Sequence, residues 1–265
     1  MIHRILVPID YSASNQSAVV SGYKLAVKLN CKIVFLHYYS SKIFKKDYEE
    51  EEEQVYALKK YVNETLAEHE LHEHIRLEFV AKEGEFKKNI LEFLKAHRAS
   101  LIVMGSHGEP SLLDRIKISN TRFLIQNATM AVWVIPNKLP AVMPKLVIYA
   151  TNNEDVSGIA FDHAIYLAEI FDIPLTILHI TKPDTRRKFK GLMVQDLSIF
   201  RYKNVKKVKV GSRDPYKKLS EIIKDSPACL VALEHKDRPF LDTILSKSMY
   251  RELINKGTVP LLVSS

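Results

Sequence analysis

The chain has 265 residues, about twice the usual length of one domain, so two domains of similar size are expected. Apolar residues make up 46% and charged residues 26% of the chain, with 8 Gly and 11 Pro, which excludes collagen-like, low-complexity and disordered proteins. No apolar run approaches the roughly 20 residues that a membrane-spanning helix needs, so no membrane contact is expected.

The first half of the chain alternates short apolar runs with segments of helical periodicity, the pattern of βαβ units that build a parallel sheet. The apolar runs are almost continuous, as expected of strands buried on both faces. We predict strands at 3–9, 32–38, 75–81, 100–104 and 130–135, and helices at 13–29, 48–71, 85–97 and 114–127.

The second half shows the same alternation after 137–144, whose prolines indicate a linker. The stretch 182–202 has no clear pattern and is interpreted as a loop that holds one or two helical turns. We place the domains at 1–140 and 143–265. The second domain is predicted to have strands at 145–150, 174–180, 204–210, 229–234 and 260–264, and helices at 155–171, 214–225 and 241–256.

The two halves, here called copy one and copy two, repeat one another. At an offset of 142, residues 5–10 overlie 147–152. At an offset of 129, the 35 residues 101–135 overlie 230–264 without a gap and share nine identities. The smaller offset means that copy two has lost 13 residues from its middle. A repeat of this kind predicts two copies of one fold.

The two cysteines and the first residues bear on the compartment. Cys31 and Cys229 lie nearly two hundred residues apart, without a partner at metal or redox spacing, which argues against a disulfide scaffold, a zinc module and a thioredoxin-type centre. We interpret both as buried thiols. Residues 1–10 have the pattern of a strand rather than of a secretory leader, so a cytoplasmic location is expected.

The net charge of +8 is unevenly divided, with +2 before residue 143 and +6 after it. The cluster Arg186, Arg187, Lys188 and Lys190 is interleaved with aromatic residues, a composition typical of a patch for single-stranded nucleic acid. The Lys-Val alternation at 207–210 is also what an edge strand shows to water. We favour the solvated edge and keep nucleic-acid binding by the basic segment as an alternative.

The segment 101–108, Leu-Ile-Val-Met-Gly-Ser-His-Gly, is followed after nine further residues by Ile118 and Ser119. Together with Ile-Leu-Val-Pro-Ile-Asp at 5–10, it resembles the signature of the universal stress protein family along nearly the whole of copy one. The repeat extends this resemblance through copy two. It implies an α/β chain with two tandem Rossmann-like (HUP-type) domains, each an open five-stranded parallel sheet flanked by helices. Such domains pair through their last strands, here 130–135 and 259–263.

Nucleotide-binding members of this family carry Gly-x-x-Gly, nine residues, then Gly-Ser or Gly-Thr after the fourth strand, and an Asp at the end of the first. Glycine lets backbone N–H groups approach phosphate oxygens, and the following helix N-terminus favours negative charge. The resemblance therefore implies a site for ATP or another adenine nucleotide in copy one. The matching positions are Asp10, Tyr38, Gly105, His107, Gly108, Ser119 and Asn120.

Both copies depart from the nucleotide motif. In copy one, Ile118 stands where the third glycine belongs, and a β-branched side chain resists positive φ and fills space that a phosphate needs. We therefore predict at most one degenerate nucleotide site, in copy one. In copy two, the replacements are Glu234, Asp237 and Lys247 for the glycines and Asn152 for the aspartate, so no nucleotide is expected there.

Some of these residues also have structural interpretations. Asp10 is equally suited to cap the helix at 13–29. Gly105 and Gly108 could form a tight strand-to-loop turn without a ligand. His37 and His179 follow equivalent strands and are interpreted as structural.

The run His69-Glu-Leu-His72-Glu-His74 suggests a metal site. Its spacing differs from the His-Glu-x-x-His motif of zinc proteases. A zinc ion held by His69 and His72, one helical turn apart, is the minority interpretation, and we favour a solvated helix end without metal.

No pattern indicates acid/base or nucleophilic catalysis, so no enzymatic activity is expected. We predict a tandem universal stress protein that acts as a stress-response sensor or adaptor. The alternative is an ATP-binding switch or weak ATPase that tolerates Ile118. The two copies are expected to form an intramolecular pseudo-dimer, a homodimer and an unidentified protein partner stay open, and nucleic acid is not expected.

Overall fold

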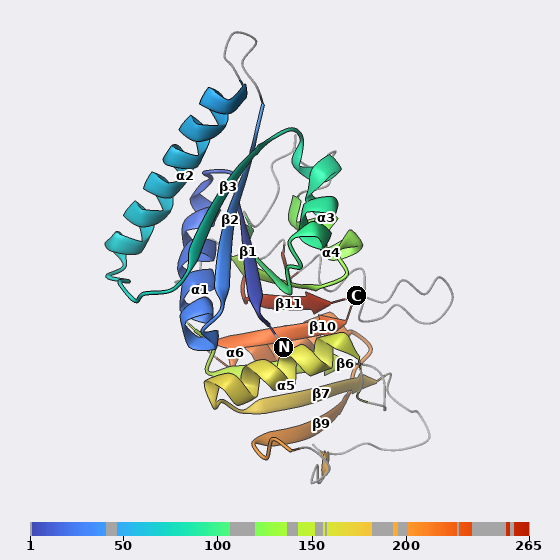
Figure 1. The fold of residues 1–265 in the computed structure, drawn as a ribbon. Helices are drawn as coiled ribbons and strands as arrows, with labels where there is room; N and C mark the ends of the chain where they lie inside the picture. The colour runs from blue at the N-terminus through green and yellow to red at the C-terminus, as the bar shows by residue number, and fades with distance from the viewer. Residues whose placement is uncertain are drawn as a thin grey trace.

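Eleven strands form one sheet, with six helices around it, in the part of the chain that the structure describes (Figure 1). The computed structural model describes residues 2–40, 47–106, 120–136, 143–151, 156, 158–181, 193–195, 201–226, 228–234, 253–254 and 257–264. The strands are β1 (Arg4–Ile9), β2 (Lys32–Tyr39), β3 (Leu77–Glu83), β4 (Leu101–Ser106), β5 (Ala131–Pro136), β6 (Leu146–Thr151), β7 (Leu175–Thr181), β8 (Met193–Gln195), β9 (Val205–Gly211), β10 (Cys229–Glu234) and β11 (Leu261–Ser264). The helices are α1 (Ala13–Leu29), α2 (Asp47–Glu68), α3 (Phe86–Ala96), α4 (Asn120–Asn127), α5 (Ile159–Phe171) and α6 (Pro215–Lys224).

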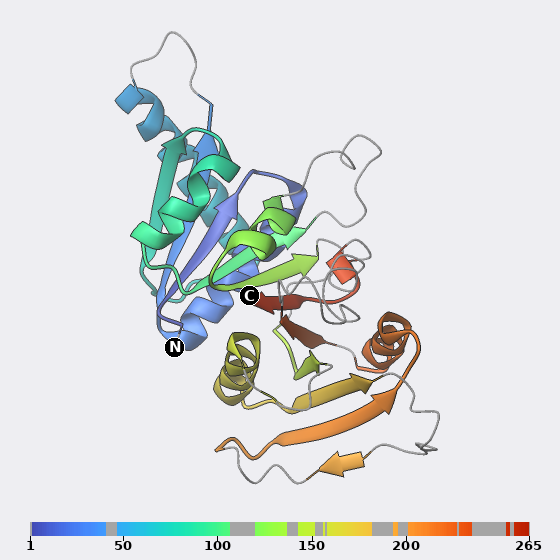
Figure 2. The same cartoon turned by 90° about the vertical axis from the view of Figure 1, so that its right-hand side faces the viewer.

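The strand order divides the sheet into the two copies. It runs β3-β2-β1-β4-β5-β11-β10-β6-β7-β9-β8. The five strands of copy one are parallel to their neighbours, as predicted. Copy two has the five predicted parallel strands and a sixth, β8, which pairs antiparallel with β9. The halves meet where β5 and β11 pair antiparallel, with Trp133 opposite Leu262. Figure 2 shows the two copies joined at this pair, with the strands of one steeply inclined to those of the other. The pairing expected between 130–135 and 259–263 is thus present, and it makes the two sheets continuous.

The central strands form because their residues are apolar on both faces. In β1 every residue after Arg4 is buried, and β4 and β5 are buried throughout. This is the burial of parallel strands covered by helices on each side. In copy one each of the first four strands is followed by a helix that returns the chain to the other end of the sheet, so the carboxyl ends of its parallel strands lie along one edge.

The first helix of each copy ends in the same way. At the end of α1, Asn30 adopts a left-handed conformation, with φ 47° and ψ 49°. At the end of α5, Asp172 adopts φ 53° and ψ 48°. Asn and Asp tolerate this conformation better than most residues, and it exposes the last helical carbonyls to backbone N–H groups of the cap. The two caps lie 142 positions apart, which is the offset of the repeat.

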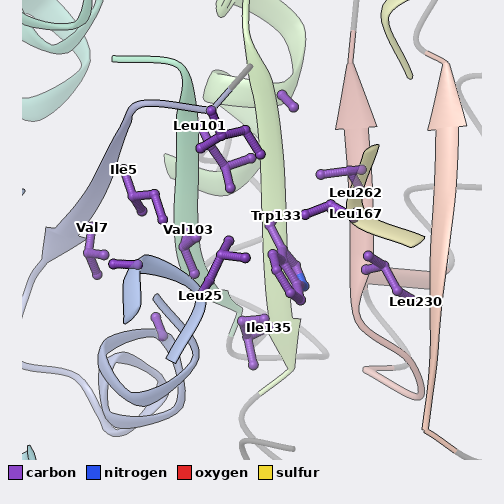
Figure 3. Close-up of a cluster of buried hydrophobic side chains, with 14 of the residues drawn as sticks. Ile5, Val7, Leu25, Leu101, Val103, Trp133, Ile135, Leu167, Leu230 and Leu262 are labelled. Carbon is purple, nitrogen blue, oxygen red and sulfur yellow. The ribbon is translucent and has the colours of Figure 1, made fainter. Parts of the chain in front are cut away.

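Two layers of apolar side chains hold the helices to the sheet. One layer, beneath α1, α2 and α5, runs through both copies without a break. The other lies beneath α3, α4 and α6 on the opposite face. Trp133 of β5 sits where the copies meet, between Leu25 of α1 and Leu167, Leu230 and Leu262 of copy two (Figure 3). The apolar layer therefore spans the junction.

Most predicted elements of copy one agree with the structure to within three residues, apart from α4, whose predicted first residues lie outside the described chain. Copy two requires two corrections. In 182–202 the structure describes a short strand, β8, where helical turns were expected. Because β8 pairs antiparallel with β9, the Lys-Val strand is not the edge of the sheet. The linker up to residue 142, the basic cluster at 186–190 and most of the helix predicted at 241–256 lie outside the described residues.

No described helix is both long enough and apolar enough to cross a membrane.

Candidate functional site

A cleft of about 360 Å³ opens at the carboxyl ends of the copy-one strands. In the sheet order, β1 lies between β2 and β4. The connection from β1 to β2 runs through α1 on one face of the sheet, and the connection from β3 to β4 runs through α3 on the other. Ligands of open α/β sheets bind at such a switch point, outside the carboxyl ends of the strands. The cleft is lined by Ile9, Asp10, Tyr38, Ser40, Gly84, Glu85, Phe86, Lys87 and Asn120. Three predicted site residues, Asp10, Tyr38 and Asn120, are thereby brought together from distant parts of the sequence.

The turn after β1 holds Asp10 at the mouth of the cleft. The backbone N–H of Asp10 donates to Oδ1 of the buried Asn15, at 2.7 Å. The Asp10 carboxylate in turn accepts from the backbone N–H of Ser12, at 3.0 Å. Ser12, not Asp10, is the N-cap residue of α1. Asp10 therefore shapes the turn, while its exposed carboxylate keeps acceptor capacity for a ligand hydroxyl.

Aromatic rings form one wall of the cleft. Tyr38, at the end of β2, meets Phe86 of α3 edge to face, with ring centroids 6.0 Å apart. Burial, followed by the nearby carboxylate of Glu92, raises the pKa of Tyr38 to about 12. Tyr38 is therefore a neutral hydrogen-bond donor at physiological pH and an apolar surface suited to a planar ring.

The loop between β3 and α3 also lines the cleft, a role that the sequence analysis missed. Gly84 donates its N–H to the Tyr39 carbonyl at 2.9 Å, which holds the loop against the end of β2. The next residues open α3 at the cleft and include Lys87, which supplies a positive charge. No motif marks these residues. Their position directly after a parallel strand was the available signal.

Gly105 does not line the cleft, although the family motif places it at the nucleotide. It is buried, and a Cβ built on it would collide with the Ser14 carbonyl oxygen of α1. The nearest atoms after that oxygen are the Ser14 carbonyl carbon, at 2.6 Å, and Cβ, at 2.8 Å. Glycine is needed here because α1 packs directly on the backbone of β4.

The other predicted phosphate-binding positions, His107, Gly108 and Ser119, lie outside the described residues, as does Ile118. Their binding role stays a prediction. Asn120, the first residue of α4, brings the end of that loop to the cleft.

The histidines singled out in the sequence have ordinary surroundings. His37 Nδ1 lies 2.9 Å from the Ile9 carbonyl oxygen, a contact that favours a proton on Nδ1. α2 ends at Glu68, so His69 and His72 are not one helical turn apart, as the zinc interpretation requires. Among the described residues, no group of three or more His, Cys, Asp or Glu side chains could hold a metal ion.

Cys229 is buried, as predicted, whereas Cys31 is only partly buried. Burial raises the pKa of Cys31 and of Cys229 from 9.0 to about 11. We expect iodoacetamide to modify both thiols of the folded protein more slowly than a free cysteine, and denaturation to abolish the difference, as mass spectrometry can follow. Labelling of the folded protein at the rate of a free cysteine would contradict this expectation.

The raised pKa values of the thiols also predict a pH dependence of stability. Because the thiols of the unfolded chain ionise first as the pH rises, the free energy of unfolding should fall between pH 9 and 11.

Comparison with known proteins gives the family. The Universal stress protein family model matches residues 1–136 and 143–265. No curated protein matches the chain. Among solved structures, it is similar to a universal stress protein from Archaeoglobus fulgidus DSM 4304, with 16% identity over 99% of this chain and 96% of that chain and a TM-score of 0.67.

Two further structures are similar. A functionally unknown protein, PA1789, from Pseudomonas aeruginosa PAO1 has 14% identity over 99% of this chain and 92% of that chain, with a TM-score of 0.61. A universal stress protein family protein from Arabidopsis thaliana, solved with AMP bound, has 22% identity over 51% of this chain and 91% of that chain, with a TM-score of 0.35. Since the family model matches both halves, the chain belongs to the universal stress protein family and carries two of its domains in tandem.

Proposed function

We propose that the chain is a cytoplasmic, non-enzymatic sensor or adaptor that binds one adenine nucleotide in the cleft of copy one. The observation that carries this proposal is the meeting of Asp10, Tyr38 and Asn120 around that cleft. Its volume falls in the range of small-molecule sites, which begins at roughly 300 Å³. Membership of a family with nucleotide-binding members supports the choice of ligand.

The cleft residues suit the parts of a nucleotide. Tyr38 and Phe86 offer apolar ring surface for a base. The Asp10 carboxylate can accept from ribose hydroxyls, as acidic residues do in dinucleotide-binding folds. Lys87 brings a positive charge for a phosphate to the cleft, whose lining also includes the carboxylate of Glu85.

Calorimetric titration with AMP and with ATP plus Mg²⁺ tests the proposal. We expect saturable binding to the wild type and affinity roughly tenfold or more lower in Asp10→Ala, because a charged hydrogen bond contributes about 1.5–3 kcal/mol. Asp172→Asn is the matched control. This variant removes a carboxylate from copy two at a residue in the left-handed conformation, which Asn also tolerates. Its affinity for the nucleotide should therefore equal that of the wild type. The proposal would be overturned if neither AMP nor ATP bound to the wild type.

The non-enzymatic part needs a separate measurement. We expect ATP incubated with the protein to stay intact by chromatography. ADP formation proportional to protein concentration, and lost in Asp10→Ala, would instead favour the ATPase alternative.

A further inference from the structure

The first helices of the two copies end alike but begin differently. At the offset of 142, the last residue of α1, Leu29, corresponds to Phe171, the last residue of α5. The first residue, Ala13, corresponds to position 155, yet α5 begins four residues later, at Ile159. Val156, the counterpart of Ser14, is not helical. By the repeat, helix α5 therefore begins four positions later than α1.

The residue that packs against the first turn of α1 also differs between the copies. In copy one this residue is Gly105, against which the Ser14 carbonyl lies. At the offset of 129 its counterpart is Glu234, at the end of β10. A glutamate side chain cannot share this space with a helical turn that needs a glycine there.

The Glu234 carboxylate lies at the start of the shortened helix. The N-cap of α5 is Gly158, with φ 119°, and it has no side chain to cap the helix. A Cβ on Gly158 would collide with Oε1 of Glu234 and lie 3.1 Å from its Cδ. The first intrahelical bond runs from Asp162 N–H to the Gly158 carbonyl, at 3.0 Å. The N–H groups before it, at 159–161, make up the positive end of the helix.

Buried hydroxyl groups surround the same position. Tyr149 and Thr151 of β6 are 1% and 6% exposed, and Ser264 of β11, the register partner of Glu234, is 1% exposed. The Ser264 hydroxyl is buried and has no hydrogen-bond partner in the described structure. Burial, and next the negative charge of Glu234, raise the pKa of Tyr149 to about 12. The carboxylate thus lies beside the start of a helix, with hydroxyl-bearing residues on the neighbouring strands.

We propose that Glu234 is an intramolecular ligand of α5: its carboxylate takes the position that a free anion would take at the helix N-terminus. It takes the place that the first turn of α1 holds in copy one, and it closes this end of copy two to anionic ligands. The proposal does not depend on nucleotide binding in copy one.

Hydrogen exchange of the amides at 159–161 tests this, because it reports on copy two alone. Glu234→Gln keeps the size of the side chain and removes its charge. We expect these amides to exchange about fivefold faster in this variant, the loss typical of a favourable charge at a helix terminus. Glu169→Gln, in the exposed last turn of α5, is the matched control and should leave them unchanged.

Glu234→Gly with inorganic phosphate as the probe provides the second measurement. In this variant phosphate should slow exchange at 159–161, whereas the wild type should show no response. Two results would overturn the proposal: wild-type exchange rates in Glu234→Gln, or equal protection of the wild type and Glu234→Gly by phosphate.

Discussion

Replacing Trp133 by Ala should lower the free energy of unfolding by about 3–5 kcal/mol, the usual cost of emptying a large aromatic position in a core. Trp133 is 2% exposed and lies on β5, opposite Leu262 across the antiparallel junction. Its ring packs against leucines of both copies (Figure 3). The cavity would open where the copies are held together, so both should lose stability. Urea unfolding followed by circular dichroism measures the effect.

Trp133→Phe separates packing from hydrogen bonding. The indole Nε1 of Trp133 is buried without a hydrogen-bond partner in the described structure. Phe keeps most of the ring volume and removes this unsatisfied donor, so the variant should lose less than about 1.5 kcal/mol. A loss below about 1 kcal/mol in Trp133→Ala would contradict the view that the junction is a packed core.

Replacing Gly105 by Ala should destabilise the protein by about 3 kcal/mol, at the upper end of the usual cost of overpacking. The added methyl group meets the backbone of Ser14, which cannot move without displacing the first turn of α1. Thermal or urea unfolding measures the loss.

Gly22→Ala is the matched control on α1. Its Cβ would meet only side-chain atoms, a Val7 methyl at 2.9 Å and the Ile33 Cδ1 at 3.4 Å. The strain is partly offset by a gain in helix propensity of up to about 1 kcal/mol, so the net change should stay within about 1 kcal/mol. Equal losses in the two variants would show that Gly105 has no special packing role.

Strand and helix positions could be predicted because their signal is local. The buried strands β1 and β4 are continuous apolar runs, and the repeat supports each prediction twice. The strand β8 escaped prediction because three residues carry almost no periodicity.

The site could be predicted only where residues match the family motif. The resemblance implied Asp10, Tyr38 and Asn120, and the fold brings them together because parallel strands present their carboxyl ends at one edge. Lys87 and Phe86 line the cleft because of the conformation of the loop before α3, which no sequence motif predicts. Gly105 shows a second limit of prediction from sequence. A glycine in a motif can allow a ligand to approach the backbone or allow a helix to pack on it, and the sequence alone does not distinguish these roles. Glu234 was recognisable as the loss of a glycine, but its place at the start of α5 required the fold.

The two copies differ at this edge of the sheet: copy one has an open cleft, and in copy two a carboxylate lies at the helix end. Native mass spectrometry of the full chain, titrated with AMP and with ATP, tests this difference directly by counting nucleotides per chain. We expect one bound nucleotide, with an affinity roughly tenfold or more lower in Asp10→Ala. Two bound nucleotides per chain, or none, would contradict it.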